Sequence, residues 1–125
     1  MKEAIKTHTA PAAIGPYSQA VRANGFIFIS GQISIDPATN QLIEGDAQQQ
    51  TERVLQNVSN ILAAAGSSLA KVVRTTVFLK SMADFPKMNE IYSKYLTEPY
   101  PARSTVEAAR LPKDVLVEID VIALA

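Results

Sequence analysis

Two charged side chains of opposite sign interrupt the apolar strand sequences that end the chain. Arg103 begins the stretch RSTVEAA, and Glu118 lies midway along VLVEIDVIAL. Arginine is the side chain best suited to a planar carboxylate, because its guanidinium group can grip both oxygens in a fork. A partly buried glutamate with a raised pKa can hold a water molecule or take its proton. Together the two residues suggest a site for a small organic acid that reacts with water.

The distance between these two charges depends on how their strands meet. We predict strands at 103–109 and 115–124, joined by turn-forming residues. If the two strands pair as an antiparallel hairpin, the residue opposite Glu118 lies near Arg103 to Thr105. From the residues alone, the competing interpretation is a structural ion pair at a subunit interface, since such pairs are common and perturb each other without catalysing anything.

A hydroxyl and a bare glycine backbone lie where another apolar strand stops. Ser30 and Gly31 follow the apolar run GFIFI, where they could either line a site or simply end the strand. Tyr17, after Gly-Pro, could be a buried aromatic residue with a satisfied hydroxyl. Asn89, within a predicted helix, could be an ordinary residue of the polar face. The residues alone leave these alternatives open.

Charge and hydropathy limit the partners and the location that we expect. The chain has 125 residues, of which 12 are basic and 12 acidic. Zero net charge argues against a general electrostatic grip on nucleic acid or an anionic membrane. The N-terminal residues contain no apolar run of the kind that a signal peptide needs, and no stretch is long enough to span a bilayer. We therefore expect a cytoplasmic protein that binds neither membrane nor generic nucleic acid.

The inventory of reactive side chains excludes several kinds of site. The chain contains no cysteine, so disulfides, thiolate metal sites and a cysteine nucleophile are ruled out. His8 is the only histidine, without clustered acids or a nucleophile-elbow sequence, which argues against a metal site and a Ser-His-Asp arrangement. No Gly-rich phosphate loop occurs, so we expect no nucleotide and no other cofactor.

The chain reads as one α+β domain over residues 1–125, because no repeat, linker or low-complexity tract divides it. The clearest element is a helix that Asp46 caps together with Gln49, and that ends at Gly66. A second helix is expected from about Asp84 to Leu96, with Pro86 in its first turn. Its apolar stripe comprises Met88, Ile91, Tyr92, Tyr95 and Leu96. The predicted order is β-β-α-β-α-β-β, with strands at 17–21, 25–30, 71–80, 103–109 and 115–124 and a turn at 36–41.

Two helices can cover only one face of such a sheet. In the last strand, Val115, Val117, Ile119, Val121 and Ala123 make an apolar face that we assign to the helices. The opposite face carries Glu118 and Asp120 among apolar residues, and the run FIFIS is apolar on both faces. An apolar sheet face without helices must be covered by something else. We therefore predict an oligomer, with Glu118 in or beside its interface and Asp120 in a structural role.

Four blocks of the sequence closely resemble the RidA family, also called YjgF or reactive intermediate deaminase A. The blocks are APAAIGPYSQAV, ISGQI, TTVFLKSMADFPKMNEIY and PARSTVEAARLPKDVLVEIDVIAL, and the resemblance covers nearly the whole chain. It implies a chorismate-mutase-like α+β fold, with two helices packed on one face of the sheet. It also implies a homotrimer in which the sheets close into a central barrel and each site lies between subunits.

The resemblance further implies an activity and its supply of substrate. Members of this family hydrolyse 2-imino acids and their enamine tautomers, such as 2-iminobutanoate and 2-iminopropanoate, to 2-keto acids and ammonia. Pyridoxal-phosphate enzymes such as threonine dehydratase release these imines. We therefore expect a deaminase that needs no cofactor of its own and works downstream of such an enzyme.

Carried over position by position, the resemblance assigns a role to each candidate residue. Arg103 resembles the arginine that clamps the substrate carboxylate, and Glu118 resembles the carboxylate that positions water. Thr105 stands where many bacterial members carry cysteine, so a thiol-dependent role is ruled out while the hydroxyl can still form hydrogen bonds. The other pocket-lining positions match Tyr17, Ser30, Gly31 and Asn89.

Two other functions compete with the deaminase. Some relatives are described as endoribonucleases that inhibit translation, but the neutral charge and the single histidine argue against that function here. A trimer that binds keto acids without turnover is the third hypothesis.

Overall fold

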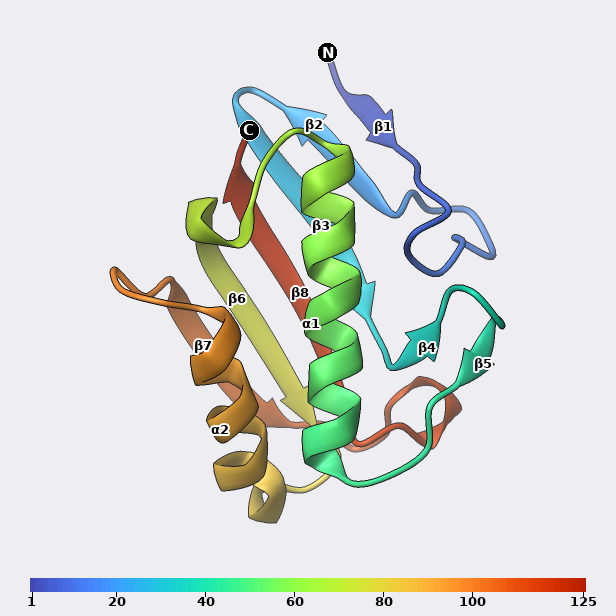
Figure 1. Cartoon of the computed structure of the whole chain (residues 1–125), viewed down its shortest axis with the longest axis vertical. Helices are drawn as coiled ribbons and strands as arrows, with labels where there is room; N and C mark the ends of the chain where they lie inside the picture. The colour runs from blue at the N-terminus through green and yellow to red at the C-terminus, as the bar shows by residue number, and fades with distance from the viewer.

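A six-stranded sheet with both long helices on one face forms the molecule (Figure 1), as seen in a computed structural model that describes all 125 residues. The strand order is β1-β2-β3-β8-β6-β7, and every neighbouring pair is antiparallel except β6 and β7, which run parallel. A separate hairpin, β4 and β5, lies beside the sheet. The strands are β1 Glu3–Ile5, β2 Ala20–Ala23, β3 Phe26–Gln32, β4 Ile35–Asp36, β5 Gln41–Leu42, β6 Val72–Leu79, β7 Ala102–Glu107 and β8 Val117–Leu124.

The two helices follow the predicted boundaries closely. Helix α1 spans Ala47–Ala64, and the predicted capping box is present. The Asp46 side chain accepts from the backbone N–H of Gln49, and the Gln49 side chain accepts from the backbone N–H of Asp46. Gly66 follows the helix with φ of 79°, a conformation that glycine adopts without strain. Helix α2 spans Phe85–Tyr95 after a short 3₁₀ turn. Neither helix is long and apolar enough to cross a membrane.

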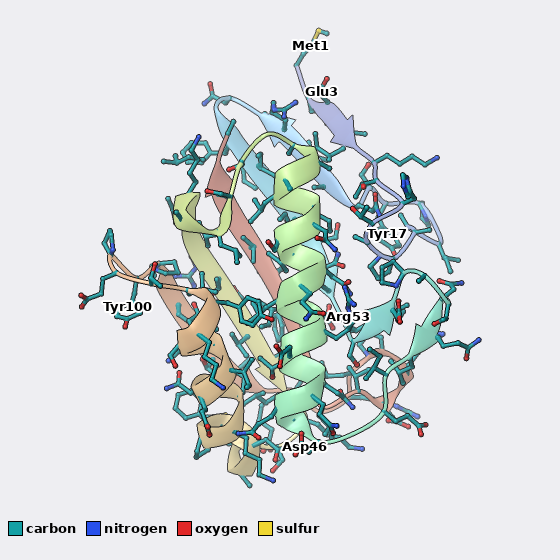
Figure 2. All side chains as sticks on the ribbon, viewed as in Figure 1. Met1, Glu3, Tyr17, Asp46, Arg53 and Tyr100 are labelled. Carbon is teal, nitrogen blue, oxygen red and sulfur yellow. The ribbon has the colours of Figure 1, made fainter.

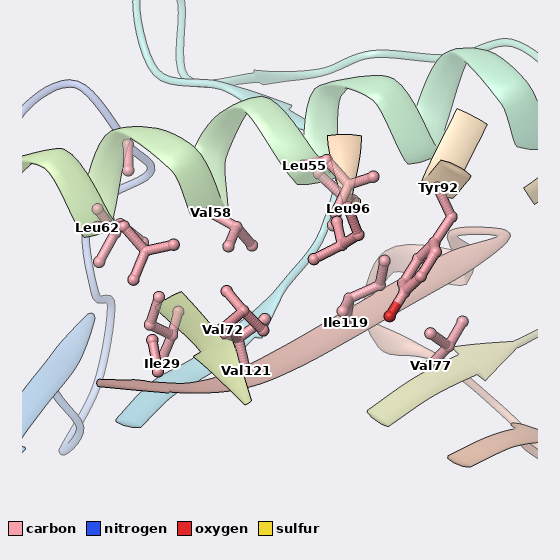
Figure 3. Close-up of a cluster of buried hydrophobic side chains, with 14 of the residues drawn as sticks. Ile29, Leu55, Val58, Leu62, Val72, Val77, Tyr92, Leu96, Ile119 and Val121 are labelled. Carbon is pink, nitrogen blue, oxygen red and sulfur yellow. The ribbon is translucent and has the colours of Figure 1, made fainter. Parts of the chain in front are cut away.

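The core lies between the helices and one face of the sheet (Figure 3). From β8 it takes the alternate residues Val117, Ile119, Val121 and Ala123, all at most 2% exposed, which confirms the predicted helix-facing side. From α1 it takes the apolar stripe Val54, Leu55, Val58, Ile61 and Leu62, all fully buried. Complete burial of such side chains stabilises a fold by about 1.5–3 kcal/mol each. The helix-facing side of the sheet therefore holds the hydrophobic core of the molecule.

The opposite face of the sheet has no helix over it. Large apolar side chains on this face and at its edges remain exposed, with Phe28, Val106 and Leu124 each 44% exposed. On this side of the sheet, Arg74 of β6 donates to the hydroxyl of Ser104 of β7 at 2.8 Å, and Asp120 of β8 lies on the same side as Glu118. We refer to this side as the open face.

The observed strands differ from the expected ones in three ways. Strands β7 and β8 do not form a hairpin, because β6 lies between them and β7 pairs with β6 in parallel. The segment 17–21 is a strand only from Ala20 onward, so Tyr17 lies in a loop. The short strands β1, β4 and β5 were not predicted. Their few residues carry too little alternation to be distinguished from loops.

Candidate active site

The guanidinium group of Arg103 lies against helix α2. Its carbon atom is 4.7 Å from the ring centre of Tyr92 and 5.4 Å from that of Phe85. Its Nη1 donates to Oδ1 of Asn89 at 2.7 Å. These three α2 residues are spaced at i, i+4 and i+7, so they share one helix face and turn it toward β7. Asn89 is therefore a partner of the arginine, and the polar-face alternative is wrong.

Arg103 is a half-buried cation without a carboxylate partner. The ion pairs of the chain are Arg22 with Glu3 and Arg110 with Asp114, and neither includes Arg103. Burying a charge without an opposite charge is costly, whereas a bound anion would supply the missing partner. The aromatic rings and the Asn89 amide lower this cost but add no negative charge. The arrangement suits an anionic ligand.

Thr105 lies two residues along β7 from Arg103 and on the same face of the strand. Its Oγ1 is the only buried side-chain nitrogen or oxygen atom of the chain that lacks a hydrogen-bond partner. Buried polar atoms are nearly always paired, so each unpaired one requires an explanation. A ligand atom beside Arg103 would provide the partner. We call Arg103, Asn89 and Thr105, with the rings of Phe85 and Tyr92, the arginine half of the site.

Glu118 faces the other side of the sheet, next to the end of β3. The pairing of β3 with β8 shifts register between Ile29 and Gln32, and Gly31 lies in this irregular stretch. A Cβ atom at Gly31 would overlap Oε2 of Glu118, so any other residue at this position would displace the carboxylate from where it lies. We call Glu118, Ser30, Gly31 and Tyr17 the glutamate half of the site.

The Glu118 carboxyl has a raised pKa. Burial is the main cause, because it disfavours the charged form, and the nearby Asp120 carboxylate raises the pKa further. Glu118 forms no ion pair with any basic residue of the chain. A carboxylate of this kind retains basicity that a salt-bridged one would lose, and it can therefore accept a proton from water.

The residues around Glu118 form a pocket of about 650 Å³. Tyr17 and Ser30 both line it, as do Lys113 and Gly31. The Ser30 hydroxyl donates to the carbonyl of Ser18 at 2.6 Å, which holds the loop before β2 against the end of β3. Tyr17 is 54% exposed, so the interpretation as a buried aromatic is wrong. Its hydroxyl accepts from the backbone N–H of Ile14 at 3.4 Å.

The two halves do not meet within one chain. Arg103 is in register with Thr75, which is fully buried under the helices, whereas Glu118 is in register with Phe78 on the open face. The two charges therefore lie on opposite faces of the sheet and form no ion pair in one chain. Figure 2 shows that Tyr17, which lines the pocket of Glu118, and Tyr100, which precedes β7, lie at opposite edges of the molecule in that view. The expected proximity of Arg103 and Glu118 along a hairpin is wrong.

The aromatic partners of Arg103 were missed from the sequence. Tyr92 was assigned to the apolar stripe of its helix, and Phe85 was given no role. Both do contact the core, so the stripe was a correct interpretation but an incomplete one. The available signal was the spacing of Phe85, Asn89 and Tyr92 on one helix face.

Comparison with known proteins places this architecture in a family. The family model described as Endoribonuclease L-PSP matches residues 7–125. A RutC family protein of Pyrococcus horikoshii is 57% identical over 123 residues, which cover 98% of each chain. The Reactive Intermediate Deaminase A, chloroplastic, of Arabidopsis thaliana is 47% identical over 98% of this chain and 65% of its own.

A solved structure has the same fold. The crystal structure of Escherichia coli TdcF with bound serine has a TM-score of 0.92 and 43% sequence identity, and the match covers 98% of each chain. The two helices on one face of a mostly antiparallel sheet are thus the fold of known relatives. On the family match and on these identities, the chain belongs to the RidA (YjgF) family.

Proposed function

We propose that the protein is a deaminase that hydrolyses 2-imino acids and their enamine tautomers to 2-keto acids and ammonia. The observation that carries the proposal is the separation of two complementary half-sites on opposite faces of one sheet. One half has a cation that lacks an anion, and the other has a basic carboxylate in a pocket. The arginine half alone can bind a carboxylate and the glutamate half alone can activate water, but the reaction needs both halves.

A homotrimer would bring the two halves together. The open face exposes apolar side chains, and oligomers form by burying such surfaces in closed, symmetric arrangements. If neighbouring subunits pack with the open face inside, the arginine half of one subunit, at the edge strand β7, meets the glutamate half of the next. We expect light scattering to give a trimer of the 13.5 kDa chain. A monomer at micromolar concentration would contradict both the interface and the shared site.

Each half then has a distinct part in the reaction. Arg103 and Asn89 hold the substrate carboxylate, because the guanidinium fork matches its two oxygens. Glu118 takes a proton from the water that attacks the imine carbon, which forms a new C–O bond. It returns this proton to the nitrogen, which gives a carbinolamine. A second proton then passes from the carbinol hydroxyl through Glu118 to the nitrogen, so that the C–N bond breaks and ammonia leaves as the keto group forms. Substrates of this class include 2-iminobutanoate and 2-iminopropanoate.

The remaining residues shape the site around the reacting atoms. The backbone of Gly31 and the Ser30 oxygen lie beside Glu118, where they can contact the reacting nitrogen or water. The orphan hydroxyl of Thr105 can contact the ligand near its carboxylate. Tyr17 forms an exposed wall of the same pocket.

Two relatives support this substrate class. The Arabidopsis relative is named a reactive intermediate deaminase, and the E. coli relative binds serine, a small molecule that carries a carboxylate and an amino group. Because free imines decompose in water, the substrate must come from an enzyme that releases it nearby. We propose a pyridoxal-phosphate enzyme in the cytoplasm as that source.

A coupled assay tests the proposal. Threonine dehydratase supplies the imine from threonine, and the formation of 2-oxobutanoate is followed with and without the protein at constant dehydratase. We expect faster keto-acid formation when the protein is present. An unchanged rate at high protein concentration would reject the deaminase function. The remaining hypothesis would be a trimer that binds keto acids without turnover, and calorimetry with 2-oxobutanoate would test it.

The family description favours one other candidate, an endoribonuclease. The zero net charge argues against it, since proteins that neutralise several phosphates bind RNA in a strongly salt-dependent way. We expect no binding to generic RNA at physiological salt. Tight, salt-sensitive binding and cleavage by a preparation free of contaminating ribonuclease would make this the leading function.

A further inference from the structure

The ring of Tyr92 is fixed from two directions. It lies 4.7 Å from the Arg103 guanidinium carbon, within the range of a cation–π interaction. Its hydroxyl and the Oγ1 of Thr75 are 2.8 Å apart and buried, so the ring is tied from helix α2 to strand β6. Figure 3 shows the side chain reaching from the helix into the core, toward the sheet. Neither residue is assigned a role by the proposed reaction.

The point of attachment coincides with the arginine. Thr75 is the residue of β6 that is in register with Arg103 of β7. The hydrogen bond between Thr75 and Tyr92 therefore fixes the ring directly beside the guanidinium group, and not elsewhere along the helix. Asn89 holds the same group at 2.7 Å through Nη1. The ring of Tyr92 and the amide of Asn89 thus restrict the position of the guanidinium group from two sides.

We infer that Tyr92, anchored by Thr75, is a positioning residue that holds the Arg103 guanidinium group ready for the substrate carboxylate. A guanidinium group has several N–H donors, of which one is used by Asn89. An aromatic ring covers its flat face and leaves the donor edges free for an anion. Without the ring, the long side chain would have to be ordered by the ligand, which weakens binding. The inference rests on the proposed function only in naming a 2-imino or 2-keto acid as that ligand.

Three substitutions test the inference in the full-length protein. Tyr92→Leu removes the ring, and Tyr92→Phe keeps the ring but removes the bond to Thr75. The matched control is Tyr95→Phe, which removes a hydroxyl of the same helix that donates to Glu52 at 2.9 Å, away from the site. Each variant is measured for melting temperature, KM and kcat with the enzymatically supplied imine, and the dissociation constant of 2-oxobutanoate. The ¹H–¹⁵N signal of the Arg103 Nε–H group reports the ring directly, because an aromatic ring shifts nearby protons.

The expected results separate positioning from folding. Tyr92→Leu should raise KM and the 2-oxobutanoate dissociation constant about 3- to 30-fold, in line with the strength of a cation–π interaction, and change kcat much less. It should also move the Arg103 signal. Tyr92→Phe keeps the ring, so the Arg103 signal should stay close to its wild-type position, while binding weakens about 2- to 5-fold. Tyr95→Phe should change neither the signal nor the binding. An Arg103 signal that Tyr92→Leu does not move, or binding losses equal to those of Tyr95→Phe, would overturn the inference.

Failure of the proposed function would look different. If the wild-type protein neither hydrolyses imines nor binds 2-oxobutanoate, the deaminase is rejected, while the Arg103 signal still decides whether Tyr92 holds the guanidinium group. If Tyr92→Leu does not fold, Tyr92→Phe carries the test, because it removes a single atom and keeps the ring.

Discussion

The arginine half and the glutamate half hold their charges in opposite ways. Arg103 is contacted by two aromatic rings and an amide oxygen, so its charged group has a fixed place. Glu118 has no basic partner and lies in an open pocket, where burial and the neighbouring Asp120 disfavour its charged form. Neither charge has an ionic partner, but the surroundings of Arg103 restrain its position, whereas those of Glu118 disfavour its charged form.

This difference suits the two tasks of the proposed reaction. A group that binds a carboxylate gains affinity from being ordered before the ligand arrives. A group that moves a proton must change its charge during the reaction, and a strong partner would hold it in one state. The sheet keeps the two environments apart, since one face is covered by helices and the other is open. Four changes can break or sharpen this comparison.

The largest effect is expected from removing the binding charge. Arg103→Ala deletes the clamp, whose charge-assisted hydrogen bonds contribute about 1.5–3 kcal/mol each. For two such bonds we expect a loss of about 10²–10⁴-fold in affinity for 2-oxobutanoate by calorimetry, together with loss of useful turnover. Arg103→Lys should restore little, because an ammonium group cannot reproduce the planar fork. Wild-type affinity in either variant would remove Arg103 from the site.

Removing the reactive charge should affect the rate instead. Glu118→Gln keeps the shape of the side chain but cannot accept a proton, so kcat in the coupled assay should fall about 10²–10⁴-fold. Binding of 2-oxobutanoate should survive or become tighter, because a negative charge near the ligand is gone. If Glu118→Gln loses binding as severely as Arg103→Ala, the two residues are a structural pair between subunits and the division of labour is wrong.

The elements could be predicted from the sequence better than the site. The capping box at Asp46 and the alternation along β8 are local signals, and both were confirmed. The hairpin failed because adjacency along the chain was used to infer pairing. A strand, a helix and a strand over 71–109 also fit a parallel crossover unit, and β6, α2 and β7 form one.

The connection between β7 and β8 explains why a hairpin does not form. It contains the buried residues Leu111 and Val115, and a 3₁₀ turn in which Lys113 and Asp114 have positive φ. Such a segment is anchored in the fold and is too long for a tight turn. The contacts that define the arginine half depend on this topology. The helix spacing could group Phe85, Asn89 and Tyr92 on one face, but it could not place Arg103 against them.

A smaller effect is expected at the orphan hydroxyl. Thr105→Val replaces an unpaired buried hydroxyl by a methyl group of similar shape, which should stabilise the free protein by about 1 kcal/mol and weaken 2-oxobutanoate binding severalfold. Thr75→Val is the matched control, because it leaves the hydroxyl of Tyr92 without its partner and should lower the stability. Denaturant titration and calorimetry measure both quantities. Equal destabilisation by the two substitutions would show that Thr105 has a partner within the protein.

The smallest effect concerns the pH dependence of stability, which follows from the raised pKa of Glu118. At low pH the carboxyl is protonated in both the folded and the unfolded chain, and its burial costs little. As the pH rises past the ordinary carboxyl pKa, the unfolded chain releases its proton first, so the free energy of unfolding falls until the raised folded pKa is passed.

Glu118→Gln removes this loss of stability. At fixed protein concentration, the variant should match the wild type near pH 3 and melt at a higher temperature at pH 7. Asp120, whose pKa burial also raises, should leave part of the slope in place. A variant that is less stable at pH 7 would mean that the folded protein stabilises the charged form of Glu118, as a structural ion pair would.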